Sequence, residues 1–432
     1  MRIKRPTLRN LVKMLEQIFV VVALLVFSGG FVSLMRRESG FESGLVEGDP
    51  VLRVIYFIIY FIALGFMLLR WKTFLRSALR CKLLWLLLVL VLLSALWAPD
   101  KGLSLRRGIA VFLTSIFGLY FAARFTIQEQ IKLLTWFFVL VVISSFVFVF
   151  ILPEYGIYEM GKYGTVLRGI FTHKNTLGRI AALIAGFFLL FTLPTTRWRW
   201  RAWAWMTLAL ALLFFSRSAG ALVAFTVLAI LHPFYKTLRW NSALNGVIYS
   251  GVLVLAMGVS IVVINNLEAF FDILGRDATL TGRTDLWKAV VYMIMKRPLL
   301  GYGYSGFWLG EGSTPNRQVW LMTGWQPSHA HNGFLDLGLA LGSIGIILFL
   351  MTYFVAFVRA IKLARVGRSV GNYWPLMYLV FMVVTNLVEA SILKSNDVFW
   401  VLYVAVLFTL AQYSRERVGF LTNPAEVSFA SG

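Results

Sequence analysis

Long apolar runs recur through the chain and restrict its fold more than any other feature of the sequence. Twelve such runs, most of roughly 15 to 24 residues, follow one another between residues 15 and 413. At about 1.5 Å per residue, a helix of this length crosses or nearly crosses a hydrocarbon core of about 30 Å. Hydrophobic side chains make up 59% of the 432 residues and charged ones only 14%, which excludes an ordinary soluble protein. The sequence predicts an all-α, polytopic membrane protein with about twelve transmembrane helices.

We treat residues 1–432 as a single integral membrane domain. The first run resembles a signal peptide, but its apolar core is too long and no A-x-A site follows, so we expect an uncleaved anchor. The predicted spans are 15–34, 52–69, 83–98, 108–123, 133–152, 180–193, 202–215, 219–231, 246–264, 334–357, 373–388 and 398–413.

Basic residues in the connecting loops predict the orientation. With the loops assigned alternately to two sides, the side of the N-terminus holds 23 of the 41 Lys and Arg residues but only four of the 19 acids. The positive-inside rule then places both termini in the cytoplasm. The net charge of +22 therefore reflects loops beside membrane spans, and we expect no nucleic-acid partner. Cys81, the single cysteine, cannot form an internal disulfide.

Two loops on the opposite, periplasmic side are large enough to carry a function. These are residues 153–179 and, between spans 9 and 10, residues 265–333. Within the second loop, residues 284–296 place Leu286, Val290, Met293 and Ile294 on one helical face, which predicts an amphipathic helix at the membrane surface. The later GYGYSG matches a dinucleotide fingerprint by letters, but it lacks the flanking strand and helix.

Basic side chains gather in these loops, where orientation gives no reason for them. Residues 168–179, RGIFTHKNTLGR, crowd five basic or polar side chains together: Arg168, His173, Lys174, Asn175 and Arg179. A guanidinium is planar and permanently charged, and it can grip a phosphate through two parallel hydrogen bonds. Two arginines fit this role: Arg217, at a turn between two short spans, and Arg283, before the amphipathic helix. Arg217 could equally be an interfacial anchor, and Arg283 could pair with a local acid such as Asp277 or Asp285.

A pair of histidines, His329 and His331, precedes the tenth span. His331 adjoins Asn332 where the loop meets the membrane, and a single imidazole there could be a proton acceptor or an ordinary loop residue. H-x-H spacing also suggests a metal, but the sequence identifies no further ligand beyond His173 and scattered acids, and it contains no D-x-D. We therefore expect no metal and no cofactor. Phosphate-binding cations with one imidazole suit transfer of a group from a lipid-linked diphosphate to an alcohol.

At this point the chain resembles the O-antigen ligase and polymerase superfamily of bacterial membrane glycosyltransferases. The residues that carry the resemblance are SRSAG, GRTDLW and HNGFL, in this order, within a similarity over about residues 85–413. The resemblance implies a GT-C-like architecture, contacts of Arg217 and Arg283 with the donor diphosphate, and a role of His331 toward the acceptor. It also implies that Arg168, His173, Lys174, Asn175 and Asn332 bind substrate.

The segment GIFTHKNTLG resembles the branch that polymerises exopolysaccharide repeat units, of the succinoglycan type, more than the ligases that transfer O-antigen to lipid A core. The implied partners are a polyprenyl-diphosphate-linked oligosaccharide such as one on undecaprenyl diphosphate, a growing polysaccharide acceptor, membrane lipids, and a chain-length regulator with export machinery. A ligase and a lipid-linked sugar transporter stay open as alternatives. A transporter is typically built from internal repeats, and none is visible here.

Overall fold

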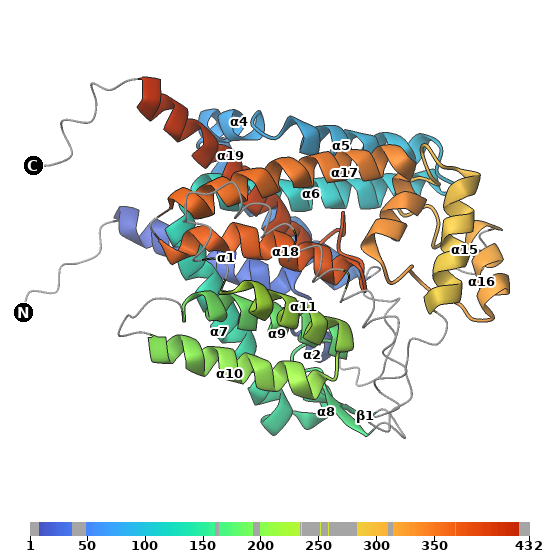
Figure 1. Cartoon of the computed structure of the whole chain (residues 1–432), viewed down its shortest axis with the longest axis horizontal. Coiled ribbons are helices and arrows are strands. Elements are labelled where there is room, and N and C mark those ends of the chain that lie inside the picture. Colours follow the sequence, from blue (N-terminus) through green and yellow to red (C-terminus); the bar gives the residue numbers. More distant parts are fainter. Residues whose placement is uncertain are drawn as a thin grey trace, which may run out of the picture.

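The chain is built almost entirely from α-helices in the computed structural model (Figure 1). The structure describes residues 8–36, 49–159, 164–192, 199–233, 283–309, 314–367 and 369–422, together with residues 235, 251 and 258. The elements are, in chain order, α1 (Leu8–Phe27), α2 (Val32–Arg36), α3 (Pro50–Leu68), α4 (Trp71–Ala78), α5 (Lys82–Leu93), η2 (Ser94–Leu96), α6 (Lys101–Arg124), α7 (Ile127–Ile151), α8 (Pro153–Gly156), β1 (Ile157–Glu159), β2 (Thr165–Leu167), α9 (Lys174–Leu190), α10 (Arg199–Ser216), α11 (Ala219–Leu231), α15 (Arg283–Lys296), α16 (Thr314–Thr323), α17 (Gly333–Val366), η4 (Val370–Tyr373), α18 (Trp374–Asn386) and α19 (Val398–Thr422).

Helix length and composition support a multi-pass membrane protein. Among the described residues, α1, α3, α6, α7 and α17 are each long and apolar enough to cross a bilayer. The pair formed by α4 and residues Lys82–Leu96 would make a sixth crossing, but it is bent by 88°. The predicted fold class is therefore confirmed at this level, with five or six supported crossings. The predicted span 246–264 lies outside the described residues apart from residues 251 and 258.

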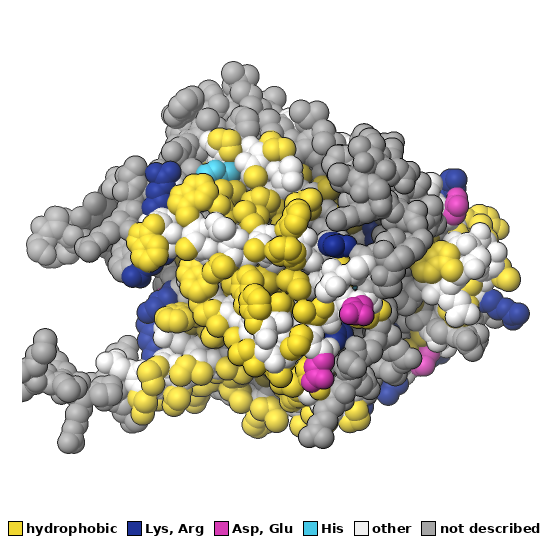
Figure 2. Space-filling model, turned by 90° about the horizontal axis from the view of Figure 1, so that it is seen from below, with side chains coloured by type: hydrophobic (Ala, Val, Ile, Leu, Met, Phe, Trp, Pro, Cys, Tyr) yellow, Lys and Arg dark blue, Asp and Glu magenta, His cyan; other side chains and the backbone are white. Residues whose placement is uncertain are grey.

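The helices sort into an interior set and a surface set. All 13 residues of α18 are buried, and so is most of α9, so both helices are surrounded by other parts of the protein. In contrast, α7 exposes an apolar side chain at every third or fourth residue, which is the pattern of a helix with one lipid-facing stripe. Figure 2 shows a broad apolar face of this kind. The exposed stripe of α7 consists of Trp136, Leu140, Ile143, Val147 and Phe150.

The long helix α17 is interrupted where the preceding loop docks onto it. Gly342 has φ 62° and ψ −160°, a conformation that L side chains rarely adopt. The loop supplies partners for the freed backbone groups: Ser343 N–H donates to the Pro298 carbonyl at 2.7 Å, and Tyr302 N–H donates to the Leu339 carbonyl at 2.7 Å. The predicted span 334–357 is thus helical but interrupted at Gly342, because the docked loop supplies hydrogen bonds that would otherwise form within the helix.

The helix expected over residues 284–296 is present as α15. Leu286, Val290 and Met293 are buried together against α16 and α17, with Ile294 packed beside them. The apolar face therefore packs on protein. In Figure 1, α15 and α16 lie at the right of the molecule, and α1 begins and α19 ends at the left, so the loop helices sit at the opposite end of the bundle from these two helix ends.

Candidate active site at the loop end of the bundle

The first turn of α9 arranges the residues of RGIFTHKNTLGR on two faces. His173 is the N-cap, with its Nδ1 accepting the Asn175 N–H at 3.0 Å. A helix repeats every 3.6 residues, so residues four apart share a face. Asn175 and Arg179 contact the loop 387–397, which joins α18 to α19. Lys174 and Gly178 lie one turn apart on the other face, toward the turn 216–218.

Gly178 allows the turn that carries Arg217 to approach α9 closely. A Cβ added at Gly178 would lie 2.5 Å from Ser218 Cβ and 2.8 Å from Ser216 Oγ, distances at which a neighbour must shift. Arg217 adopts φ 50° between α10 and α11, and its side chain is exposed. Its positive charge is close enough to act on Lys174. The contact therefore places two cations together, and like charges that share a site favour an anionic partner.

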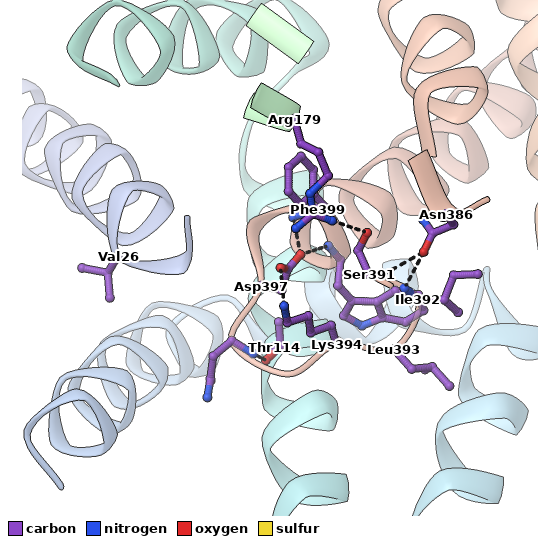
Figure 3. Close-up of polar contacts among 12 residues, drawn as sticks. Val26, Thr114, Arg179, Asn386, Ser391, Ile392, Leu393, Lys394, Asp397 and Phe399 are labelled. Carbon is purple, nitrogen blue, oxygen red and sulfur yellow. Dashed lines mark hydrogen bonds and ion pairs between the residues drawn. The ribbon is translucent and has the colours of Figure 1, made fainter. Parts of the chain in front are cut away.

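The loop 387–397 is shaped by polar side chains at both of its ends (Figure 3). At its start, Asn386 Oδ1 accepts the N–H groups of Ser391 at 2.8 Å and Ile392 at 3.2 Å. At its end, Asp397 Oδ1 accepts the Phe399 N–H at 2.8 Å. These bonds hold the backbone of a short loop that the sequence analysis did not single out.

Gly333 brings the start of α17 against the same loop. A Cβ at this position would lie 2.1 Å from Asn386 Oδ1, so only glycine fits. Gly333 N–H donates to the Glu389 carbonyl at 3.1 Å, and Asn332 Nδ2 donates to the Leu387 carbonyl at 3.3 Å. The segment HNG therefore docks directly on the loop that carries Glu389.

Glu389 is the acidic centre of the site. Its Oε1 accepts Asn175 Nδ2 at 2.9 Å. Burial alone raises the pKa of this carboxyl, but the positive charge of Arg179, followed by the histidines 329 and 331 and by Arg283, lowers it to about 2. Glu389 is therefore ionised at neutral pH.

Arg179 and Arg283 approach the loop 387–397 from two helices. Arg179 is 5% exposed, its Nη1 donates to Ser391 Oγ at 3.4 Å, and its guanidinium stacks 4.8 Å from the Phe399 ring centroid (Figure 3). Arg283 is the first residue of α15, and its Nη1 donates to the Val388 carbonyl at 3.4 Å. Burial lowers the pKa of Arg283 and Glu389 partly offsets this, as expected for a cation held in a partly buried site.

Two hydrogen bonds to the backbone of Ala330 hold the turn 329–331, which carries both histidines. Its N–H donates to Asp336 Oδ1 at 3.0 Å, and its carbonyl accepts Trp287 Nε1 at 3.0 Å. His331 has φ 49°, and this left-handed conformation folds the chain so that the ring centroids of His329 and His331 lie 3.9 Å apart. An L residue in this region is strained and needs support from its surroundings. Trp287 and Asp336 supply that support.

Both imidazoles are neutral at physiological pH. Burial is the main cause in each case. It lowers the pKa of His331 to about 4, although Glu389 partly opposes the shift, and the pKa of His329 to about 3, with a further contribution from His331. A neutral His331 can accept a proton, which an imidazolium cannot.

The structure brings most of the predicted site residues together. His173, Lys174, Asn175, Arg217, Arg283, His331 and Asn332 all lie on segments that meet around α9 and the loop 387–397. Arg168 has a different setting: it is 2% exposed, and its guanidinium donates to the carbonyls of Glu154 and Tyr155 at 2.8 Å each. That arrangement holds the hairpin of β1 and β2 against α8.

Glu389 and Arg179 are the residues that the sequence analysis missed as site residues. Glu389 stands in a loop of about ten residues between two predicted spans, on the side expected to face the periplasm. An ionisable residue inside the membrane is costly and commonly functional, and Glu389 directly follows the predicted span 373–388, which is the signal that could have identified it.

Comparison with known proteins gives one family match and one similar relative. Residues 204–350 match the sequence profile of the O-antigen ligase (Wzy_C) family, a stretch that contains Arg217, Arg283 and His331. The chain is also similar to the exopolysaccharide production protein ExoQ of Rhizobium meliloti (strain 1021), with 26% identity over 290 residues. That alignment covers 62% of this chain and 63% of ExoQ, slightly less than two thirds of the relative. The predicted resemblance to the O-antigen ligase and polymerase superfamily is confirmed.

Proposed function

We propose, from the match of residues 204–350 to the O-antigen ligase family, that the chain is a membrane glycosyltransferase that polymerises exopolysaccharide repeat units. In this proposal it transfers a glycan from a polyprenyl-diphosphate-linked oligosaccharide to a sugar hydroxyl of the acceptor, at the periplasmic face of the inner membrane. The observation that carries the proposal is the convergence of separate cationic segments and a neutral histidine around one buried carboxylate.

The cations are assigned to the donor. Lys174 and Arg217 face each other across the close contact of α9 with the turn 216–218, and Arg283 lies at the start of α15. The leaving diphosphate gains negative charge in the transition state, and preorganised guanidinium groups stabilise that charge. This role needs no divalent ion on the diphosphate. His173, Asn175 and Asn332 are proposed to shape the substrate-binding surface, while Arg168 is assigned to holding the hairpin.

His331 is assigned to the acceptor. The acceptor hydroxyl oxygen attacks the anomeric carbon of the donor sugar, the bond between that carbon and the phosphate oxygen breaks, and the polyprenyl diphosphate leaves. Neutral His331 takes the hydroxyl proton and becomes an imidazolium. The ionised Glu389, which interacts electrostatically with His331, stabilises that positive charge.

Two observations favour polymerisation over ligation. The similarity to an exopolysaccharide production protein extends beyond the matched family segment to 62% of the chain. Within the segment GIFTHKNTLG, Asn175 donates to Glu389 and Lys174 lies near Arg217, which supports the proposal that this stretch contacts substrate. Transfer of O-antigen to lipid A core is the second candidate function, because the family that matches is described as O-antigen ligase.

The proposal is tested in membranes that contain His331→Ala, His329→Ala or the unmodified protein. Polymer formation should fall by about 10²-fold or more in His331→Ala, because proton transfer contributes about 10²- to 10⁴-fold. His329→Ala should have a milder effect, and a chelator should leave the rate of the unmodified protein intact. If the chelator abolishes activity and both histidines are equally essential, a metal-dependent reaction replaces the one proposed here.

A further inference from the structure

We propose that His329, His331 and Glu389 form a binding site for a divalent transition-metal cation such as Zn²⁺, and that Zn²⁺ bound there inhibits the enzyme. The binding site stands on the geometry alone. The inhibition rests on the proposed function, in which His331 needs its free lone pair to accept the proton of the sugar hydroxyl.

The three side chains are arranged as metal ligands. One nitrogen from each histidine and one carboxylate oxygen of Glu389 all lie within 4.8 Å of one another. Ligand atoms around a tetrahedral Zn²⁺ are about 3.4 Å apart, given Zn–N and Zn–O distances of about 2.0 to 2.2 Å. Small side-chain rotations therefore bring the three groups to bonding distance. The backbone need not move, because the positive φ of His331 already brings the centroids of the two rings within 3.9 Å of each other.

One nitrogen of the histidine pair lacks a hydrogen-bond partner among the described residues. His331 Nδ1 is buried and accepts or donates no hydrogen bond within the part of the chain that the structure describes. Burying a polar atom without a partner is unfavourable, so this nitrogen is a natural place for a bound ion or water. His329 Nδ1 already accepts the His331 N–H at 3.1 Å, which leaves its Nε2 for a metal.

The donor set selects the kind of cation. Two imidazoles with one carboxylate are the protein ligands of many zinc sites, and a fourth position stays open for water. Mg²⁺ and Ca²⁺ prefer oxygen ligands and are disfavoured by this set.

Nearby positive charge makes this site suited to reversible binding. Arg179 and Arg283 both act on Glu389, and a divalent cation must compete with them. A dedicated structural zinc site would not be lined by two guanidinium groups. We therefore expect Zn²⁺ to bind reversibly, in competition with productive use of His331.

Binding is tested with Co²⁺, whose visible absorption reports nitrogen coordination in a tetrahedral site, followed by displacement with Zn²⁺. The purified full chain in detergent is titrated beside His329→Gln, Glu389→Gln and the matched control His232→Gln, which alters a histidine at the end of α11. The unmodified protein and the control should bind one Co²⁺ per chain, and each cluster variant should bind about tenfold more weakly or worse. Equal binding by all four proteins would place the metal elsewhere and overturn the proposal.

Inhibition is tested separately on polymer formation. Zn²⁺, but not Mg²⁺, should slow the unmodified protein, and a chelator should restore its rate. His329→Gln should lose most of the Zn²⁺ sensitivity when each rate is divided by that variant's own metal-free rate. A chain that binds Co²⁺ through the cluster but is not slowed by Zn²⁺ contradicts the inhibition. A chain that makes no polymer at all but shows the Co²⁺ spectrum contradicts the proposed function and keeps the metal site.

Discussion

At the scale of single residues, the proposed contacts with the diphosphate depend on the shape of the guanidinium group as well as on its charge. Arg217→Lys and Arg283→Lys keep the positive charge, but an ammonium cannot reproduce the two-pronged contact of a guanidinium with a diphosphate. A charge-assisted hydrogen bond contributes about 1.5 to 3 kcal/mol, so each variant should lose roughly ten- to hundredfold in polymer formation. The measurement is the initial rate in membranes with equal amounts of each protein.

Arg106→Lys serves as the matched control for both variants. Arg106 is exposed near the start of α6, and its Nε donates to the Gly102 carbonyl of its own helix at 3.3 Å. It should retain nearly normal activity. If Arg217→Lys or Arg283→Lys behaves like this control, that arginine returns to the role of an interface or helix-start residue.

Most of the residues that converge around the loop 387–397 could be identified from the sequence, but Glu389 was not. The cations and His331 were identifiable because loops on the side predicted to be periplasmic have no topological reason to be basic. Glu389 was missed because its importance comes from interactions with three distant segments: α9, which carries Asn175 and Arg179, the start of α15 with Arg283, and the start of α17 with Gly333. No local pattern of letters encodes such convergence.

At the scale of elements, the contact between α9 and the turn 216–218 depends on Gly178. Gly178→Ala should push α9 away from Ser218 and reduce activity at least tenfold, since a shift of about 1 Å in a catalytic group can cost about 10²-fold. Adding Ser218→Gly removes the Cβ that would clash and should restore part of the loss. The measurement is the initial polymerisation rate of the single and double variants.

Gly65→Ala is the control for a new methyl group on a helix, because an added Cβ at Gly65 meets nothing within 4 Å. This variant should fold and act like the unmodified protein. If Gly178→Ala is as active as Gly65→Ala, or Ser218→Gly gives no rescue, the close approach does not position Arg217.

A helix could be predicted from the sequence where its own residues carry the periodic apolar pattern. The apolar periodicity of residues 284–296 identified α15 and its buried face, because that pattern is written in the residues themselves. The break in α17 at Gly342 was not predictable, because it exists only where Pro298 and Leu299 lend their carbonyls to the next residues of the helix. A glycine inside an apolar run looks the same whether the helix continues or breaks.

At the scale of the whole molecule, hydropathy locates apolar segments more reliably than it predicts how many of them cross the membrane. Helix α18 is apolar and fully buried in protein, yet it has 13 residues. Length alone therefore supports only five or six of the twelve predicted crossings among the described helices. Whether a short helix such as α9 or α18 spans the bilayer depends on what surrounds it, and composition does not report that.

Orientation is a testable property of the whole chain. The excess of basic residues on the side of the N-terminus predicts that a reporter fused after Gly432 is cytoplasmic and that one inserted within residues 310–320 is periplasmic. A phosphatase reporter, active only in the periplasm, and a fluorescent reporter, active only in the cytoplasm, should give complementary signals at both sites. Signals from the same side at both positions would mean that the number of crossings between them is even, and the periplasmic site would be lost.

The most direct measurement of the central claim uses the purified chain in liposomes with a defined polyprenyl-diphosphate-linked repeat unit. Glycan length and free polyprenyl diphosphate are followed in the same reaction. We predict that glycan chains lengthen and that one polyprenyl diphosphate is released for each repeat added, without lipid A in the mixture. An unchanged glycan that only crosses the bilayer, or transfer that begins only when lipid A core is supplied, would contradict a polymerase.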